Sequence, residues 1–388
     1  MPRIFLIAGE ASGDVLGARL MTALRAQQPG LMFSGIGGAR MGEAGLVSQF
    51  PMQELAVMGL AEILPRILLL RRRLNETVAA IKASRPDIVV TIDSPGFSLR
   101  VLKALSGTGI KRVHYVAPQV WAWRQERVKK FPGLWEELLC LLPFEPEFFS
   151  AHGLHPLFTG HPVLESGAGS GDAARFRAAH GLDPADVPVV LMPGSRVTET
   201  TRLLPVFRDT MALLGEKLPD LRPVLAAAPV IANVVEARTR DWKVQPIVVR
   251  DVSTRYDAFA AARAALTKSG TSTLELAMAG VPMAVTYRVN PISAAIGRRL
   301  IKVKHVAMIN LLAGHALVPE LLQENCTPEK LSATLQTLLT DADSAAQQRS
   351  GFSTALASLQ APDGKPSAAA AAAILQLLDR ESKEEAAF

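Results

Sequence analysis

The sequence of 388 residues has few cysteines and no long apolar run. Its two cysteines, Cys140 and Cys326, lack the spacing of metal ligands, and such sparing use argues for a reducing compartment and against a disulfide framework. Although 49% of the residues are apolar, no run reaches the roughly 18 residues that a membrane-spanning helix needs. The first apolar stretch, residues 4–8, is too short for a secretion signal and predicts a strand. The composition therefore predicts a folded protein that does not span a membrane.

The sequence carries an excess of positive charge but no nucleic-acid-binding motif. The formal net charge is +6, which predicts an anionic partner. The arginines do not lie among exposed aromatic residues, so nucleic acid is not the predicted partner. Much of the basic charge lies beside strongly apolar residues, which favours an anionic lipid surface.

Short apolar runs that end in Gly, Asp or Pro alternate with helical stretches, and this alternation predicts an α/β protein with parallel sheets covered on both faces. The predicted strands are residues 4–8, 32–36, 88–92, 113–116, 189–192, 224–227, 247–249, 264–267 and 283–287, and the predicted helices include 16–27, 69–84 and 202–217. Residues 166–172 are the most Gly/Ser-rich stretch and predict a domain boundary. The simplest architecture is two Rossmann-like domains, residues 1–165 and 166–355, facing across a cleft. Residues 356–388 would form a C-terminal helix and tail, with the apolar side of helix 366–380 packing back on a neighbour.

The most informative segment is residues 266–275, which read as a strand end, a hydroxylated turn and the start of a helix. Gly270 allows the backbone to approach a ligand, and the amides that follow at a helix N-terminus favour an anion. Glu275 could accept hydrogen bonds from a ribose. The hydroxyls available to the same anion belong to Ser269, Thr271, Ser272 and Thr273. The segment predicts a grip on a nucleotide diphosphate, although an N-capped helix with a polar first turn would also fit.

A second glycine turn, Gly194-Ser195-Arg196, follows the predicted strand 189–192. The planar guanidinium of Arg196 suits phosphate oxygens. A single turn of this kind is usually only a turn. Two such loops at strand ends in one α/β half favour a phosphate site, because ligands of open parallel sheets bind at the carboxyl ends of the strands.

The amino-terminal half presents carboxylates at its strand ends. Residues 9–14 (GEASGD) follow the first strand, with Ser12 as the expected N-cap, and they suit a sugar better than a pyrophosphate. Strand 88–92 delivers Asp93, which a general base for an acceptor hydroxyl would require. An Asp that only satisfies turn amides is an equal alternative. Glu10 is the other candidate for the base.

Two further segments of this half have two interpretations each. Trp121 and Trp123 follow the strand 113–116 on a loop predicted near the cleft, although they could also be core residues. Residues 60–74 combine dense leucine with four arginines, which is typical of a segment that inserts apolar side chains into a membrane surface and holds anionic headgroups. A buried core helix with a basic edge is the alternative. The membrane-contact candidates include Leu68, Leu69, Arg71 and Arg72.

Taken together, these motifs resemble the lipid-A-disaccharide synthase family of glycosyltransferases over nearly the whole chain. The resemblance is carried by residues 9–14, 56–59, 92–95, 115–124, 191–196, 269–275, 287–288 and 310–314. It implies a GT-B fold and an inverting transfer from UDP-2,3-diacylglucosamine to 2,3-diacylglucosamine 1-phosphate (lipid X), which yields the β-1,6-linked disaccharide 1-phosphate and UDP.

The same resemblance implies further residues of the site, the need for cofactors and the location of the enzyme. It adds Arg288 and Asn310 to the donor-binding residues and implies neither a cofactor nor a metal. That agrees with the sequence, because the Asp341-Ala342-Asp343 run lies in a polar stretch far from any predicted strand end. It also places the enzyme in the cytoplasm, on the surface of the inner membrane. The chain departs from the family at Gly96, where a second Asp is usual, and at Ser94, where Ala is common, so Asp93 is the one base candidate left in that motif.

Two other functions remain as alternatives. A UDP-N-acetylglucosamine 2-epimerase shares the architecture and a similar diphosphate grip, but it acts on a soluble nucleotide sugar and would not need the membrane segment. A membrane-surface sensor of nucleotide sugars would bind without turnover. The sequence leaves open whether the protein is a homodimer.

Overall fold

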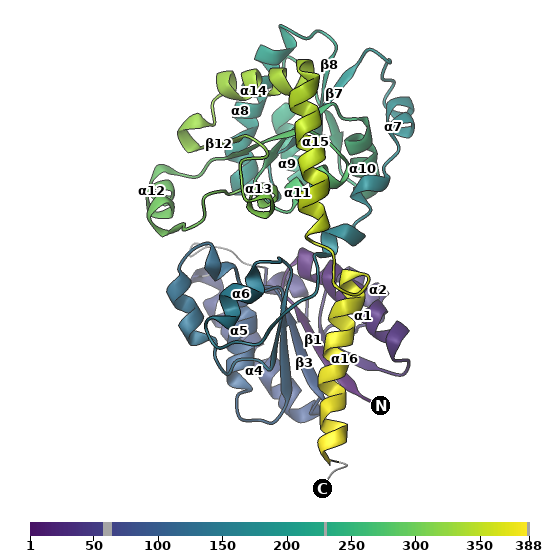
Figure 1. Cartoon of the computed structure of the whole chain (residues 1–388), viewed down its shortest axis with the longest axis vertical. Helices are drawn as coiled ribbons and strands as arrows, with labels where there is room; N and C mark the ends of the chain where they lie inside the picture. Colours follow the sequence, from purple (N-terminus) through teal and green to yellow (C-terminus); the bar gives the residue numbers. More distant parts are fainter. Residues whose placement is uncertain (57–63, 229–230, 386–388) are drawn as a thin grey trace. The chain divides into compact units, whose positions relative to one another are not determined.

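The computed structural model describes residues 1–56, 64–228 and 231–385 and divides the chain into two compact units (Figure 1). The first unit comprises Met1–Pro162 and Leu359–Phe388, and the second comprises Val163–Ser358. The boundary falls directly after residues 160–162, and the chain returns to the first unit for its last helix. Each unit is built on a parallel sheet of six strands.

The sheet of the first unit has the order β2-β1-β3-β4-β5-β6. Its strands are β1 (Arg3–Ala8), β2 (Met32–Ile36), β3 (Ile88–Ile92), β4 (Lys111–Tyr115), β5 (Glu137–Cys140) and β6 (Pro156–Phe158). The helices are α1 (Ala11–Gln27), α2 (Ala39–Glu43), α4 (Ile67–Ser84), α5 (Pro95–Ala104), α6 (Glu145–Ser150) and α16 (Pro366–Glu385). Central strands β1 and β3 are buried along most of their length, which is why they appear in the sequence as unbroken apolar runs.

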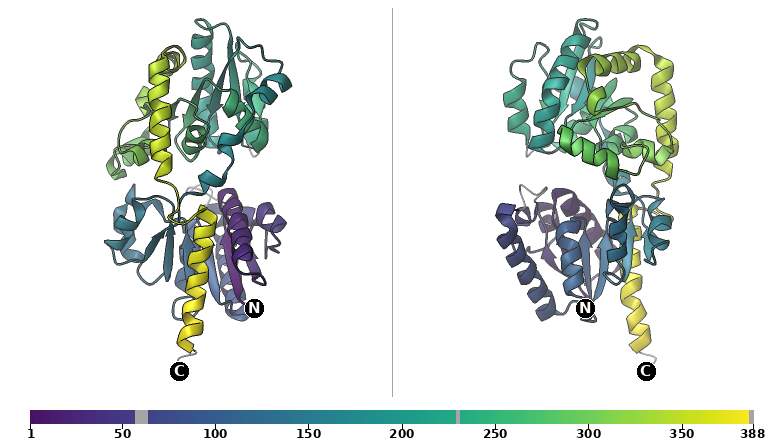
Figure 2. Two further views of the ribbon diagram at one scale, coloured as in Figure 1. Left: turned by 45° about the vertical axis from the view of Figure 1, so that its right-hand side comes forward. Right: turned by 90° about the vertical axis from the view of Figure 1, so that its left-hand side faces the viewer.

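The C-terminal helix α16 packs beside α1, although more than 300 residues separate them (Figures 1 and 2). Ile374 and Leu377 are buried in the same hydrophobic core as strand β1, and Leu375 and Leu378 pack against it. The Gln27 amide donates a hydrogen bond of 2.8 Å to the carbonyl of Ala368. The predicted docking of this helix on a neighbour is thus confirmed, and the neighbour is the amino-terminal sheet unit.

The sheet of the second unit has the order β12-β11-β10-β7-β8-β9. Its strands are β7 (Val187–Met192), β8 (Leu221–Ala226), β9 (Ile247–Val249), β10 (Ala264–Lys268), β11 (Met283–Tyr287) and β12 (Glu320–Leu322). Its helices are α7 (Ala173–Ala179), α8 (Val197–Gly215), α9 (Ala232–Thr239), α10 (Val252–Ala261), α11 (Ser272–Met278), α12 (Pro291–Leu300), α13 (Met308–Ala313), α14 (Pro328–Thr340) and α15 (Ala342–Ala357). A separate core joins α8, α9 and α14 to this sheet.

Every predicted strand is present, but β5, β6 and β12 were not predicted. The strands β6 and β12 contain three residues each, and Pro156 and Glu320 interrupt their apolar pattern, whereas the equally short edge strand β9 is wholly apolar and was predicted. The Asp-x-Asp run begins at the N-cap of α15, where the Asp341 carboxylate accepts hydrogen bonds from the amides of Asp343 and Ser344. Among residues 1–56, 64–228 and 231–385, no helix is both long and apolar enough to cross a membrane.

Candidate active site

In the first unit, two loops lie where the chain reverses its direction along the sheet. After β1 the chain moves to β2 on one side, whereas after β3 it moves to β4 on the other. Such a reversal opens a crevice at the carboxyl ends of the two strands, where ligands of open α/β sheets bind. The sheet register pairs Ala8 of β1 with Ile92 of β3. The following loops, which carry Glu10 and Asp93, are therefore neighbours.

Asp93 is held in a strained and closely fixed backbone. Asp93 and Ser94 both have left-handed conformations, with φ of 51° and 47°, which side chains other than glycine rarely adopt. Residues held in such conformations cost about 1–3 kcal/mol each and cluster at functional sites. The Asp93 amide donates to the Tyr115 carbonyl at 2.9 Å, and its carbonyl accepts from the Ser98 hydroxyl at 2.7 Å. These bonds leave the carboxylate as the part of Asp93 that is available for chemistry.

The electrostatic environment of Asp93 also suits a base. Burial raises the pKa of its carboxyl above the ordinary value, and a hydrogen bond from the Ser94 amide opposes that shift only in part. A raised pKa brings a carboxylate nearer to the basicity that proton abstraction from a hydroxyl requires.

The loop after β1 differs from the prediction at Ser12. Helix α1 begins at Ala11, so Glu10 and not Ser12 is the N-cap residue, and Ser12 is exposed in the first turn. The prediction was wrong because only Gly9 and Glu10 separate β1 from α1, so Ser12 already lies inside the helix. Asp14, in the same motif, is buried and structural. Its carboxylate accepts hydrogen bonds of 2.8, 3.0 and 2.9 Å from the amides of Gly38, Arg40 and Met41 at the start of α2.

The structure separates the two predicted tryptophans. Trp121 is buried, with its ring edge-on to Phe144 at 4.8 Å between ring centres, and its indole N–H donates to the Glu145 carboxylate at 3.0 Å. Trp123 is 40% exposed, and the guanidinium of Arg124 lies over its ring at 4.8 Å. Trp121 therefore fits the core interpretation, whereas Trp123 presents an aromatic face to solvent.

In the second unit, the two predicted phosphate loops also flank a reversal point. After β7 the chain moves to β8, whereas after β10 it moves to β11 on the other side. The register pairs Met192 of β7 with Thr267 of β10. Residues 193–196 and 269–271 therefore leave adjacent strand ends, as a shared ligand site requires.

A buried carboxylate joins these two loops. Glu199, in the first turn of α8, pairs with the Arg196 guanidinium at 3.3 Å and with the Lys268 ammonium at 3.1 Å. Gly194 and Gly270 have φ of 112° and 159°, conformations that residues other than glycine rarely adopt. The arrangement places two cations and two glycine turns together at one sheet edge.

The hydroxyl groups of the second loop mainly shape the turn. Ser269, Ser272 and Thr273 donate to the carbonyls of Val306 (2.7 Å), Lys268 (3.2 Å) and Gly270 (2.9 Å). A hydroxyl has one proton to donate, so in this conformation these three do not offer it to a ligand. Thr271 is exposed at the N-cap of α11, and Ser195 is exposed in the other loop.

The remaining predicted donor residues lie in different settings. Glu275 accepts hydrogen bonds from Arg255 at 3.1 Å and from the Tyr256 hydroxyl at 3.0 Å. Arg288 is exposed directly after β11. Asn310 is fully buried, and its amide bonds to both backbone groups of residue 318 and to a carboxylate. A direct donor contact through the Asn310 side chain would need that network to open.

In the arginine-rich segment 60–74, only some of the residues predicted to contact a membrane are exposed. Residues 57–63 lie outside the described residues. Leu64, Ile67 and Leu68 are 65%, 54% and 78% exposed, and together they form what we call the apolar patch. Leu69 is half-buried, and Leu70 packs against the core of the first unit. The segment is therefore neither a fully buried helix nor uniformly exposed.

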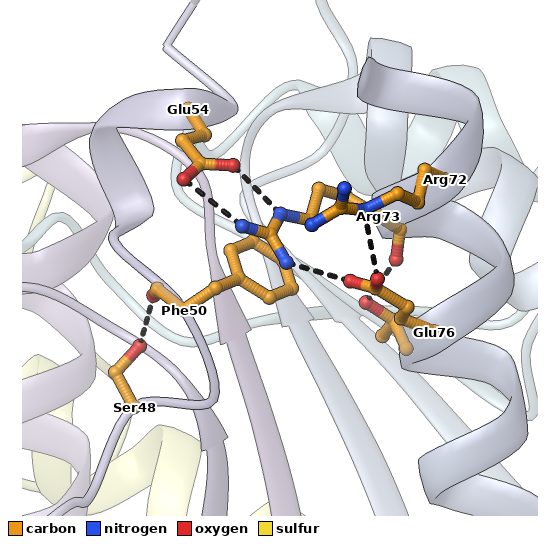
Figure 3. A network of polar contacts seen from close by, with 7 residues as sticks. Ser48, Phe50, Glu54, Arg72, Arg73 and Glu76 are labelled. Carbon is orange, nitrogen blue, oxygen red and sulfur yellow. Dashed lines mark hydrogen bonds and ion pairs between the residues drawn. The ribbon is translucent and has the colours of Figure 1, made fainter. Parts of the chain in front are cut away.

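The arginines of this segment divide in the same way. Figure 3 shows Arg73 turned toward Glu54, with bonds of 2.6 and 3.0 Å, and toward Glu76 at 2.7 Å. Its guanidinium also lies 4.5 Å from the centre of the Phe50 ring. Arg72 is exposed but pairs with Glu76 at 2.9 Å. Arg66 and Arg71 are exposed and form no ion pair with any described residue.

The site residues that the sequence did not reveal are Glu199, Lys268, Arg255 and Tyr256. Glu199 lies three residues after Arg196, and that spacing could have indicated the pair had the helix predicted over 202–217 been extended back to its start at Val197. Lys268 precedes the predicted turn directly. Arg255 and Tyr256 lie about 20 residues before Glu275, and nothing local in the sequence connects them to it.

The fold of the two units can be compared with that of known proteins. A UDP-N-acetylglucosamine 2-epimerase from Neisseria meningitidis, solved with UDP-GlcNAc, matches with a TM-score of 0.64 at 10% identity, covering 97% of this chain and 100% of that one. The glycotransferase of kitacinnamycin matches with a TM-score of 0.63 at 19% identity, covering 97% and 99%. At these identities the likeness concerns the fold alone, and that fold is GT-B.

Sequence comparison narrows the class to one family. Residues 4–374 match the family described as lipid-A-disaccharide synthetase. The lipid-A-disaccharide synthase of Gluconobacter oxydans (strain 621H) is 60% identical over 377 residues, which cover 97% of this chain and 91% of the relative. The chain therefore belongs to the lipid-A-disaccharide synthetase family, and it is a glycosyltransferase of lipid A biosynthesis.

Proposed function

We propose that the protein transfers 2,3-diacylglucosamine from UDP to the 6-hydroxyl of 2,3-diacylglucosamine 1-phosphate, forming a β-1,6 bond with inversion. The proposal rests on one observation together with family membership: each unit has a pair of loops at the point where the strand order reverses, and the two pairs carry different chemical groups. One unit holds a carboxylate of raised pKa, and the other holds cations beside glycine turns. These are the parts that an acceptor base and a diphosphate leaving group require.

Donor binding is proposed to use the second unit. Arg196 would hold the diphosphate, with Gly194 and Ser195 on its own loop. The turn of Ser269, Gly270, Thr271, Ser272 and Thr273 would supply backbone amides, while Glu275 would bind the ribose and Arg288 would lie at the rim. As charge builds on the departing UDP, fixed cations stabilise it without a metal ion. Asn310 would then support this loop from within the fold.

Catalysis is proposed to use Asp93 as the general base. The acceptor 6-hydroxyl attacks the anomeric carbon from the face opposite UDP, the C1–O bond to the diphosphate breaks, and Asp93 takes the hydroxyl proton. One in-line displacement inverts the anomeric centre, which turns an α-linked donor into a β-linked product. Glu10, on the neighbouring loop, is the alternative base.

The acylated substrates reside in a membrane, and the apolar patch is proposed to bring the enzyme to that surface. Leu64, Ile67 and Leu68 would insert among acyl chains, while Arg66 and Arg71 would bind anionic headgroups. We place this contact at the cytoplasmic face of the inner membrane. Ser12 and Trp123 are proposed to contact the acceptor.

Mass spectrometry of the products formed from the two acylated monosaccharides tests the function. The expected result is a tetra-acyl disaccharide 1-phosphate and one UDP per bond formed, with a β anomeric coupling by NMR and with activity that persists in EDTA. Conversion of UDP-N-acetylglucosamine to its 2-epimer without any acceptor would favour the epimerase. Binding of the UDP-sugar in micelles without turnover would favour the sensor.

A further inference from the structure

The carboxylate of Glu199 is unusual because one buried group holds two cations. Its side chain is only 9% exposed, and its Oε1 pairs with the Arg196 Nη1 at 3.3 Å and the Lys268 Nζ at 3.1 Å. Its other oxygen, Oε2, is buried as well and has no hydrogen-bond partner among the residues that the structure describes. Removing such a group from water without full compensation is costly.

The open oxygen lies directly against the first glycine turn. A Cβ added at Gly194 would lie 2.6 Å from Glu199 Oε2 and 3.2 Å from Glu199 Cβ, and the φ of 112° is one that side chains rarely adopt, so the position favours glycine. A glycine at this position also allows a ligand to approach the backbone closely.

Lys268 lies at the centre of the same sheet edge. It is the last residue of β10, between β7 and β11, and its register partner on β11 is Thr286. Its ammonium lies 5.3 Å from the centre of the Tyr287 ring and 3.9 Å from where a Cβ at Gly270 would stand. The side chain is about four-fifths buried, yet its charged end lies beside the Gly270 turn and contacts Glu199, which lies against the Gly194 turn.

The charges of this cluster do not cancel. One carboxylate faces two cations, so the cluster retains a net positive charge between two turns that a ligand backbone or phosphate can approach. Glu76 also contacts two arginines, Arg72 and Arg73, but Glu54 supplies a second carboxylate there, so the charges of that structural network balance. The surplus charge is suited to a diphosphate, which carries more than one negative charge.

We propose that Lys268 binds the donor diphosphate together with Arg196, and that Glu199 is the positioning residue that holds both cations at the glycine turns. This inference rests on the proposed function in taking UDP as the ligand. It adds to the donor site a binding residue that lies outside the motif Ser269–Thr273. It also means that the two phosphate loops bind the diphosphate through cations held by the same carboxylate.

Calorimetric titration of UDP and of uridine separates this role from a structural one. Lys268→Met is expected to weaken UDP binding at least about tenfold, the loss expected for a charged hydrogen bond, and to leave uridine binding unchanged. Lys243→Met is the matched control and should change neither affinity. Equal losses for UDP and uridine, or no loss for UDP, would overturn the assignment of Lys268.

The link through Glu199 is tested by combining variants. Because both cations share one carboxylate and one ligand, Lys268→Met and Arg196→Ala together should weaken UDP binding by less than the product of the two single losses. Losses that multiply would show that Glu199 does not couple the two cations.

The last experiment uses the unaltered protein, so it does not depend on a variant that folds. UDP, but not uridine, should protect Lys268 from acetylation by acetic anhydride, as read by peptide mass spectrometry, while Lys243 reacts equally in all samples. Equal acetylation of Lys268 with and without bound UDP would contradict the proposal. A protein that binds no UDP at all would overturn the donor site itself, and is thereby distinguished from a failure of Lys268 alone.

Discussion

Gly9 and Ser94 are in such close contact that a Cβ on residue 9 would lie 2.5 Å from the Ser94 hydroxyl and 2.8 Å from its Cβ. The contact joins the loop after β1 to the loop after β3, and the Ser94 hydroxyl has no hydrogen-bond partner among the described residues. Any side chain at residue 9 would push on Ser94 and, through it, on Asp93. The spacing of the loops that carry Glu10 and Asp93 thus depends on residue 9 being a glycine.

Gly9→Ala is expected to lower both stability and activity. Overpacking of this kind costs about 1–3 kcal/mol, and the displacement of Asp93 should reduce kcat more than UDP affinity. Denaturant unfolding and steady-state kinetics measure the two effects. Gly42→Ala is the matched control, because a Cβ there meets nothing within 4 Å. The double variant Gly9→Ala/Ser94→Gly should recover activity, since it removes the clash and places glycine at a left-handed position. A double variant as impaired as the single one would refute this explanation.

Asp93→Asn is expected to remove the basic group while keeping its shape. We expect kcat to fall at least about 100-fold with UDP binding nearly unchanged. Should Asp93→Asn stay active while Glu10→Gln is inactive, the two roles must be exchanged.

The pKa shift of Asp93 gives this prediction a pH dependence. Because burial raises the carboxyl pKa above 3.8, the base becomes protonated as pH falls through that raised value, and kcat/KM should fall with it. The same sign governs stability: a raised folded pKa means that stability present below the unfolded pKa is lost as pH rises. Asp93→Asn should therefore unfold at an equal or higher temperature than the wild type at neutral pH. A marked loss of stability would indicate that Asp93 serves mainly the turn.

Arg196→Ala is expected to reduce kcat/KM by the equivalent of roughly 2–4 kcal/mol, the cost of losing an electrostatic donor from a catalytic site. Arg208→Ala is the control, because Arg208 lies on α8, the helix that Arg196 precedes as the N-cap residue, and both arginine side chains are 43% exposed. A kcat/KM near the wild-type value for Arg196→Ala would show that this arginine does not contact the phosphates.

The sequence predicted the fold well because buried parallel strands leave a local signal. Strands such as β3 and β7 are apolar runs with clear ends, and the two reversal points follow from the order of those strands. The edge strands β6 and β12 lack that signal because Pro156 and Glu320 leave only two apolar residues in each, whereas the three residues of β9 are all apolar.

Only those parts of the site that lie in short contiguous motifs could be predicted. Gly194 and Arg196 follow one predicted strand and the turn after β10 follows another, so their closeness was expected from the shared edge of a parallel sheet. The partners of other residues lie outside the same motif: Arg73 bonds to Glu54, and Asn310 bonds to Glu320. No periodicity encodes such pairs, so a buried, fully bonded Asn310 was indistinguishable from a ligand-binding one.

Membrane association is expected to depend on the apolar patch rather than on every leucine of the segment. Leu64, Ile67 and Leu68 are exposed, so replacing all three with Ser should leave stability within a few tenths of a kcal/mol per site. Each apolar side chain that enters lipid contributes about 1.5–3 kcal/mol when fully buried. We therefore expect at least a tenfold loss of co-sedimentation with phosphatidylglycerol-containing vesicles. Leu70→Ser is unsuitable for this purpose, because Leu70 packs against the core and its loss would destabilise the fold.

The control for this triple variant replaces three other exposed apolar residues, Val47, Val252 and Ile301, with Ser. It should pellet with vesicles as the wild type does.

Arg66→Gln/Arg71→Gln should weaken binding to anionic vesicles but not to neutral ones, by about 1 kcal/mol per arginine, and added salt should reduce the difference. The variant Arg73→Gln should behave differently, because Arg73 pairs with Glu54 and Glu76 and lies on Phe50 (Figure 3). Its loss should lower the unfolding temperature and leave the headgroup preference unchanged. If the triple serine variant still pellets with vesicles at wild-type levels, the apolar patch is not the membrane contact.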